Sequence, residues 1–133
     1  MAFGSNIIHT VSLMIEVDPA AADQFHVMKA PSALTVLSAY MVSENALGAG
    51  TAFDLALQNW GTAGTGVQTD GTIAVAAGTG LSANTPLTAT LTEAAQYIDS
   101  GEWLVLSYTE VGGGWQSGDR ALFTFNYVLG KGI

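Results

Sequence analysis

The stretch EWLVLSYTEVGGGWQSGDRALFTFNYVL, residues 102–129, carries the strongest indication of the fold. Apolar and polar residues alternate through residues 103–110 and again through 120–129, and a period of two is typical of half-buried strands. The segment between these runs is rich in Gly, Ser and Asp, which favour turns. The sequence therefore predicts two strands, and we expect them to pair as an antiparallel hairpin with a long tip.

Short runs of the same kind occur along the rest of the chain. Residues 7–17 alternate with Ile8 and Met14 as apolar exceptions on the polar side, and residues 34–42 are apolar or small on both faces, which favours a central strand covered on both sides. The remaining runs are 25–29, 51–60, 72–77 and 86–92. About eight short strands without a long helical pattern predict one domain, residues 1–133, of the all-β class: an antiparallel β-sandwich or jelly roll.

The glycine-rich stretch LQNWGTAGTGVQTDGTIAV, residues 57–75, raises the question of a phosphate-binding loop. Such a loop needs a Lys followed by Ser or Thr, and then a helix whose N-terminus faces the phosphate. The stretch contains no Lys, and TIAVAAG after it is too short and too rich in β-branched residues and Gly to be that helix. We interpret it as a link between two antiparallel strands at the rim of the sandwich.

Residues for catalysis or for cofactor and metal binding do not form a recognisable motif. The chain has no Cys, and His9 and His26 lie apart in strands with apolar neighbours. No DxDxDG calcium loop and no GxSxG nucleophile motif is present. Five carboxylates fall near expected turns, where solvation explains them: Asp70, Asp99, Glu102, Glu110 and Asp119. We expect no enzyme activity, no cofactor and no metal.

Charge excludes two classes of partner. Eleven acidic residues stand against three basic ones, for a formal net charge of −8. Binding to nucleic acid or to anionic membranes depends on clustered Lys and Arg, so neither partner is expected. No apolar run reaches the length of a membrane span, and the start MAFGSNIIHT does not resemble a signal peptide.

The scarcity of charge bears on association. Only 11% of the residues are charged, about half the usual share. This composition suits a subunit that packs against copies of itself or another protein, and it equally suits a sandwich rich in small residues. Lys is nearly absent from the expected strands, although lysine commonly guards sheet edges. We therefore expect a terminal arm or another subunit to cover at least one edge.

Tryptophans are the candidate partner-binding residues. Trp115 stands between glycines at 112–114 and 118, so its immediate neighbours cannot bury it, and Gln116 follows it. Trp60 ends a strand, directly before the first glycine of the glycine-rich stretch. Exposed aromatic side chains at loop tips commonly make binding contacts. The alternative is that Trp115 folds back as a lid over its own sandwich.

Three stretches resemble the small β-sandwich capsid decoration, or cement, proteins of tailed bacteriophages. They are APSALTVLSAYMVSENALGAGTAFDLALQN (30–59), GTIAVAAGTGLSANTPLTATLT (71–92) and IDSGEWLVLSYTEVGG (98–113). The resemblance lies in the order and spacing of strands and turns over about residues 30 to 129, and it contains no diagnostic motif. The first thirty residues have no counterpart in it.

The resemblance implies a virion structural protein without catalytic residues. Decoration proteins bind the outside of the major capsid shell and stabilise it, so the implied partner is the major capsid protein. The implied location is the capsid exterior, after synthesis in the host cytoplasm. Together with the scarcity of charge, this leads us to expect a homo-oligomer, either trimer or dimer. The alternative is a carbohydrate-binding module or a host-attachment protein like a head fibre, with Trp60 and Trp115 stacking on sugars.

Overall fold

The computed structural model describes residues 7–15, 23–46, 53–65, 71–78, 81–110 and 120–130. Within these ranges the chain is built almost entirely from short strands and includes a single 3-10 helix. The elements in chain order are β1 (His9–Ile15), β2 (Asp23–Lys29), β3 (Leu34–Ser43), β4 (Phe53–Asn59), β5 (Gly71–Gly78), β6 (Pro86–Thr88), β7 (Thr90–Leu91), η1 (Glu93–Ala95), β8 (Tyr97–Ile98), β9 (Trp103–Glu110) and β10 (Ala121–Leu129).

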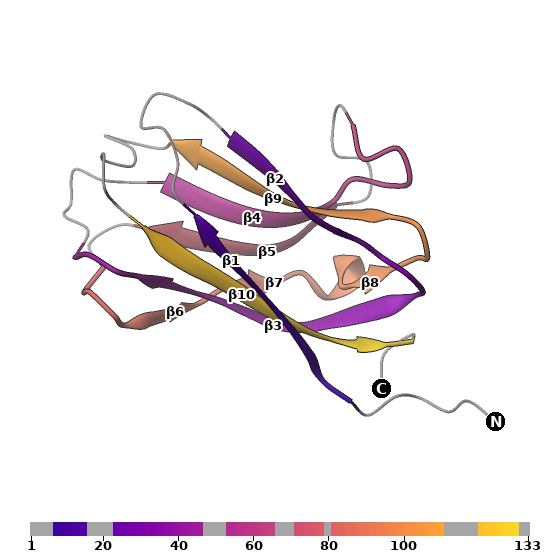
Figure 1. Cartoon of the computed structure of the whole chain (residues 1–133), viewed down its shortest axis with the longest axis horizontal. Coiled ribbons are helices and arrows are strands. Elements are labelled where there is room, and N and C mark those ends of the chain that lie inside the picture. The colour runs from indigo at the N-terminus through magenta and orange to yellow at the C-terminus, as the bar shows by residue number, and fades with distance from the viewer. Residues whose placement is uncertain are drawn as a thin grey trace.

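The strands form two sheets that enclose one core (Figure 1). In sheet A the order is β1-β10-β3-β6, and β8 also pairs with β3. In sheet B the order is β2-β9-β4-β5-β7. Every pairing between these strands is antiparallel. The predicted all-β fold, an antiparallel sandwich, is therefore confirmed.

The connectivity is that of a jelly roll. Strand β1 pairs with β10, β2 with β9, β3 with β6, and β4 with β5, so the chain forms one long antiparallel ribbon that is rolled into two sheets. The tip of this ribbon is the connection between β4 and β5. The glycine-rich stretch therefore joins two antiparallel neighbours, as the sequence predicts.

The predicted hairpin between residues 103–110 and 120–129 is wrong. Strand β9 pairs with β2 and β4 in sheet B, whereas β10 pairs with β1 and β3 in sheet A. Alternation specifies that each strand buries one face, but it does not specify a neighbour. Both strands do bury that face in the common core, from opposite sheets, through residues such as Leu106 and Phe123.

Strand β3 is central, as predicted, because it lies between β10 on one side and β6 and β8 on the other. The expectation that both its faces are covered is wrong. Its inward residues are buried, but outward residues such as Tyr40 and Val42 are only half-buried. Tyr40 and Val42 instead line an open hollow on the outer face of the sheet.

The core contains large aromatic and aliphatic side chains from both sheets. Phe53 of β4 and Tyr108 of β9 are fully buried, with ring centroids 5.6 Å apart. Both residues belong to sheet B, and sheet A contributes side chains such as Phe123 and Phe125 to the same core. Burying an aromatic side chain contributes roughly 2–3 kcal/mol, so this core stabilises the sandwich without disulfides. The other largest fully buried side chains are Phe123, Phe125, Ile15, Leu34, Met41, Leu55, Leu57, Ile73 and Ile98.

Candidate functional site

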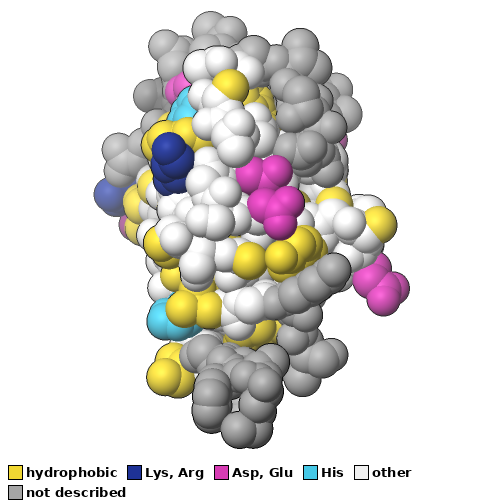
Figure 2. Space-filling model, turned by 90° about the vertical axis from the view of Figure 1, so that its right-hand side faces the viewer, with side chains coloured by type: hydrophobic (Ala, Val, Ile, Leu, Met, Phe, Trp, Pro, Cys, Tyr) yellow, Lys and Arg dark blue, Asp and Glu magenta, His cyan; other side chains and the backbone are white. Residues whose placement is uncertain are grey.

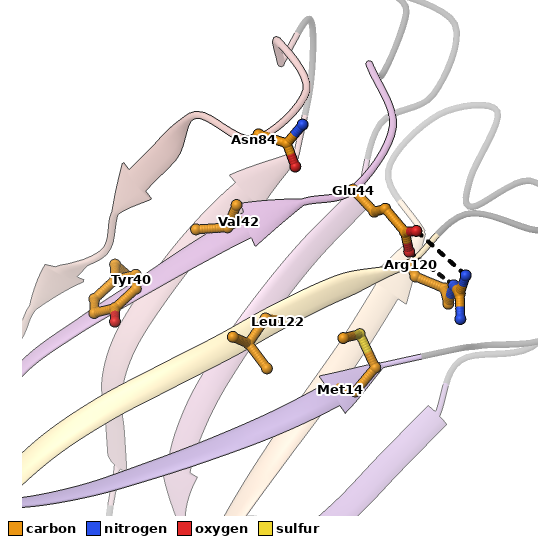
Figure 3. Close-up of a pocket in the computed structure, with 7 residues that line it drawn as sticks. All are labelled: Met14, Tyr40, Val42, Glu44, Asn84, Arg120 and Leu122. Carbon is orange, nitrogen blue, oxygen red and sulfur yellow. Dashed lines mark hydrogen bonds and ion pairs between the residues drawn. The ribbon is translucent and has the colours of Figure 1, made fainter.

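The outer face of sheet A contains an apolar hollow of about 470 Å³ (Figure 3). Met14 on β1 lies in register with Leu122 on β10, which lies in register with Val42 on β3. Residues opposite each other in antiparallel strands point to the same side of the sheet, so these three side chains form a continuous strip. Tyr40 lies two residues before Val42 and extends the same surface. Met14 is 52% exposed, which leaves the strip open to solvent.

An ion pair marks one end of the hollow. Arg120 Nε lies 2.8 Å from Glu44 Oε2, and Arg120 Nη2 donates a hydrogen bond to Glu44 Oε1 at 3.2 Å (Figure 3). The two backbones are also joined, because Glu44 N donates to Arg120 O at 2.9 Å. Both side chains are about half exposed, so the pair contributes little to stability. It does fix a positive and a negative group at the edge of an apolar surface.

The rest of the outer face of sheet A is polar and internally hydrogen-bonded. Thr10 Oγ1 donates to Asn126 Oδ1 at 2.7 Å, and Asn126 Nδ2 donates to Ser38 Oγ at 2.9 Å. The hydroxyls of Ser12 and Thr124 lie 2.9 Å apart. These groups satisfy one another, so the hollow is the part of the face that gains most from contact with another molecule.

Sequence reasoning did not identify this hollow as a site. Its residues are far apart along the chain, and only the pairing of β1, β10 and β3 brings them together. The available signal was Met14, an apolar residue on the polar side of an alternating run. An exception of this kind indicates an outer face that is covered or binds something.

Trp60, predicted to bind a partner, is only 6% exposed. Its Nε1 donates to Gln58 Oε1 at 2.9 Å, and its ring meets that of His26 edge-on, with centroids 5.9 Å apart. A sugar-stacking platform needs one open ring face, which this burial restricts in the isolated chain. Partner binding through Trp60 stays a prediction.

Trp115 and Gln116, the other predicted contacts, lie in residues 111–119, outside the described part of the chain. This segment starts after Glu110 of β9 and ends before Arg120, which lines the hollow. The segment with the predicted contact residues is therefore followed directly in the sequence by Arg120, a residue at the rim of the hollow.

The two histidines and Glu102 contact their neighbours within the fold, whereas Glu110 Oε1 is buried without a hydrogen-bond partner among the described residues. His9 stacks on Tyr127 with ring centroids 5.0 Å apart, and His26 packs edge-on against Trp103. Glu102 Oε2 accepts hydrogen bonds from Asn59 Nδ2 and from the backbone N–H of Asp99, each at 2.8 Å.

Within the described ranges, no group of three or more His, Cys, Asp or Glu side chains is arranged to hold a metal ion. No helix of these ranges has the length and apolarity to span a membrane.

Charged side chains are sparse on one face of the described part of the chain. Figure 2 shows one face on which hydrophobic and uncharged polar side chains cover most of the described surface, with only a few basic and acidic groups between them. The sequence has only 11% charged residues, and the folded chain does not concentrate them on this face. Such a surface can be covered by another protein with little cost of removing charges from water.

Comparisons with known proteins bear on the fold. No protein-family model and no curated protein sequence matches the chain. A chain of the cyanophage Pam1 capsid asymmetric unit is similar, with a TM-score of 0.54 and 20% identity over 98% of this chain and 89% of that one. The infectious bursal disease virus VP2 subviral particle is more distant, with a TM-score of 0.41 and 17% identity over 95% of this chain and 33% of that one. The first similarity shows a shared fold.

Proposed function

We propose that this chain is a virion structural protein, a capsid decoration or cement protein that binds the outside of the major capsid shell and stabilises it. The observation that carries the proposal is the open apolar hollow on sheet A of a jelly roll whose fold is similar to that of a chain in a phage capsid asymmetric unit. The major capsid protein is the proposed partner. The chain acts as a homo-oligomer, a dimer or trimer, on the capsid exterior.

The hollow is the first proposed contact with the shell. Its strip of Met14, Leu122 and Val42 can receive an apolar side chain, while Glu44 and Arg120 offer both charges to groups at the edge of the contact. Interfaces of this kind combine an apolar centre with a polar rim. The rim pair favours one orientation of the partner, since a like charge placed against either group is unfavourable.

The second proposed contact is Trp115 with Gln116, because their segment joins β10 at Arg120, on the rim of the hollow. A tryptophan inserted into a partner is among the strongest single contacts found at protein interfaces. Trp60 belongs to the same proposal only if binding rearranges the packing that now leaves it 6% exposed.

Stabilisation follows from selective binding. A ligand that binds the assembled shell and not the separated subunits raises the free energy of disassembly by about 2.7 kcal/mol per site when its concentration is 100 times its Kd. A decoration protein that contacts two neighbouring subunits therefore stabilises the shell by binding alone. Neither a covalent step nor a cofactor is required.

Co-sedimentation tests the proposal. Empty shells assembled from the major capsid protein encoded in the same genome are mixed with the purified chain and pelleted, and we expect the chain in the pellet at a fixed ratio to capsid subunits. A chain that stays in the supernatant at tens of micromolar contradicts capsid binding. Retention on a glycan array together with that result would favour the carbohydrate-binding alternative.

A further inference from the structure

The edges of the two sheets are protected to different degrees. Unpaired strand edges invite pairing with other chains, and proteins protect them with short strands, prolines, bulges or charges. On one side of the sandwich the edge strands β6, β7 and β8 are only 3, 2 and 2 residues long, and β6 begins with Pro86. On the other side, β2 contains a register shift between His26 and Met28 and carries Asp23 and Lys29. These four strands are poor templates for a further strand.

Strand β1 lacks all of these protections. It has seven residues, HTVSLMI, with no Pro, no Lys and no acidic residue. All seven pair with β10 without a register shift, so the strand is regular along its whole length. Among the described residues β10 is its only strand partner. Within the described part of the chain, its other edge therefore presents a regular series of backbone donors and acceptors to one further strand.

Incomplete burial is found on the same side of the sandwich. Strand β3 lies against β5 and β7 across the core, so β1 and β2 flank the opposite side. Val11 and Leu13 on β1 point inward and pack against the core but are only half-buried, as are Phe25 and Val27 on β2. An additional strand beside β1 would cover the exposed parts of these side chains.

We propose that β1 pairs antiparallel with β1 of a second copy of this chain, so that sheet A continues from one copy into the other. The proposal rests on the oligomer part of the proposed function and not on capsid binding. The edge fits a second copy because the chain carries a formal charge of −8, yet no acidic residue lies within β1. Two copies can therefore pair along this strand without placing carboxylates opposite each other, and like charges in such positions destabilise strand pairing.

The fold restricts the register of this pairing. Even-numbered residues of β1 point outward and odd-numbered residues inward, and directly opposed residues must point to the same side of the sheet. The two-fold axis that relates the two copies must therefore pass between a residue and the same residue of the second copy. Only an axis at Ser12, the central residue of β1, pairs all seven residues of the strand. This register places Val11 opposite Leu13 of the second copy and Thr10 opposite Met14 of the second copy. The half-buried Val11 and Leu13 thereby gain apolar neighbours.

Cysteine cross-linking of the full chain tests this register directly, because the natural sequence contains no Cys. Directly opposed residues have Cα atoms about 4.5–5.5 Å apart, within the range that a disulfide spans. Ser12→Cys alone should therefore form a covalent dimer in most of the protein under mild oxidation. Thr10→Cys is the matched control on the same exposed face, since its counterpart in the second copy lies four residues along the strand, about 13 Å away. It should not cross-link alone, but it should when mixed with Met14→Cys.

The outcomes separate this proposal from its alternatives. Failure of Ser12→Cys to cross-link, or equal cross-linking by Thr10→Cys alone, overturns the proposed pairing. A dimer or trimer by sedimentation without the Ser12→Cys cross-link would overturn the pairing while leaving the oligomer intact. Ser12→Lys, which places two lysines opposite each other, should weaken self-association at least tenfold.

Discussion

Gly64 lies directly against the indole ring of Trp103, so closely that a Cβ at this position would overlap the ring. Its φ of +63° belongs to the left-handed region, which favours glycine. The contact belongs to a set of bonds that hold the start of the β4–β5 connection on β9: Trp60 N donates to Trp103 O, and Trp103 N donates to Gly61 O, each at 2.9 Å. His26 Nε2 lies 2.5 Å from Gly64 O. The glycine here allows close packing at the tip of the rolled ribbon.

The first prediction is that Gly64→Ala destabilises the fold by about 3 kcal/mol. An alanine in the left-handed region costs roughly 1–2 kcal/mol, and overlap with a packed ring adds a similar amount. Gly101→Ala is the matched control, since Gly101 also has a positive φ of +86°, but a Cβ there would lie within 4 Å of no atom beyond its two chain neighbours. We expect it to cost only about 1 kcal/mol. Equal losses for both variants in urea unfolding would show that contact with Trp103 is unimportant.

The second prediction concerns the alkaline limit of stability. The pKa of the Tyr97 phenol is raised above its usual 10.0, first by its partial burial, then by the negative charge of Asp99, to which the phenol donates a hydrogen bond, and last by the charge of Glu102. The unfolded chain then releases this proton at lower pH than the folded chain. The contribution of Tyr97 to stability is complete below pH 10 and is lost as the pH rises through the raised pKa.

Replacing the phenol removes this pH dependence. As the pH rises above about 9.5, Tyr97→Phe should lose less stability than the parent, measured by urea unfolding at each pH. Asp99→Asn should bring the Tyr97 titration, followed by ultraviolet absorbance, closer to its ordinary range. Identical alkaline stability profiles for the parent and Tyr97→Phe would contradict the assigned shift.

The sequence predicted more of this fold than of its site. The alternation of apolar and polar residues correctly predicted β9 and β10 as strands with one buried face. It could not predict their partners, because two strands that pair with each other and two strands that pack from opposite sheets bury the same residues. The resemblance to capsid decoration proteins implied a β-sandwich, which the structure has, whereas the decoration role that it implied stays a prediction. The hollow could not be predicted, since it requires the register that aligns Met14, Leu122 and Val42. Burial of Trp60 could not be predicted, because its partners Gln58 and His26 are brought around the ring only by the folded chain; partner binding through Trp60 stays a prediction.

The third prediction is that Leu122→Ala weakens binding to capsid shells about tenfold. Losing an apolar contact at the centre of an interface costs roughly 1–2 kcal/mol, and tenfold in Kd corresponds to about 1.4 kcal/mol. Val75→Ala is the control, because Val75 on β5 is 39% exposed but belongs to sheet B, away from the hollow. Similar Kd values for Leu122→Ala, Val75→Ala and the parent would exclude the hollow from the contact.

The fourth prediction is that Trp115→Ala weakens shell binding about thirtyfold while leaving the Tm nearly unchanged. A buried aromatic contact at an interface contributes about 2 kcal/mol, which corresponds to this factor. Gln116→Ala should have a smaller effect, because it removes a hydrogen-bonding group and little apolar area. A large drop in Tm for Trp115→Ala would instead indicate that Trp115 is a lid on its own sandwich.

Cryo-electron microscopy of capsid shells with and without the purified chain tests the central claim most directly. The account predicts additional density on the outer surface, in contact with the major capsid protein, into which the two sheets of this jelly roll fit with the hollow of sheet A facing the shell. Shells that carry no added density at saturating concentrations of the chain, or that carry it only on the inner surface, would contradict its assignment as a capsid decoration protein.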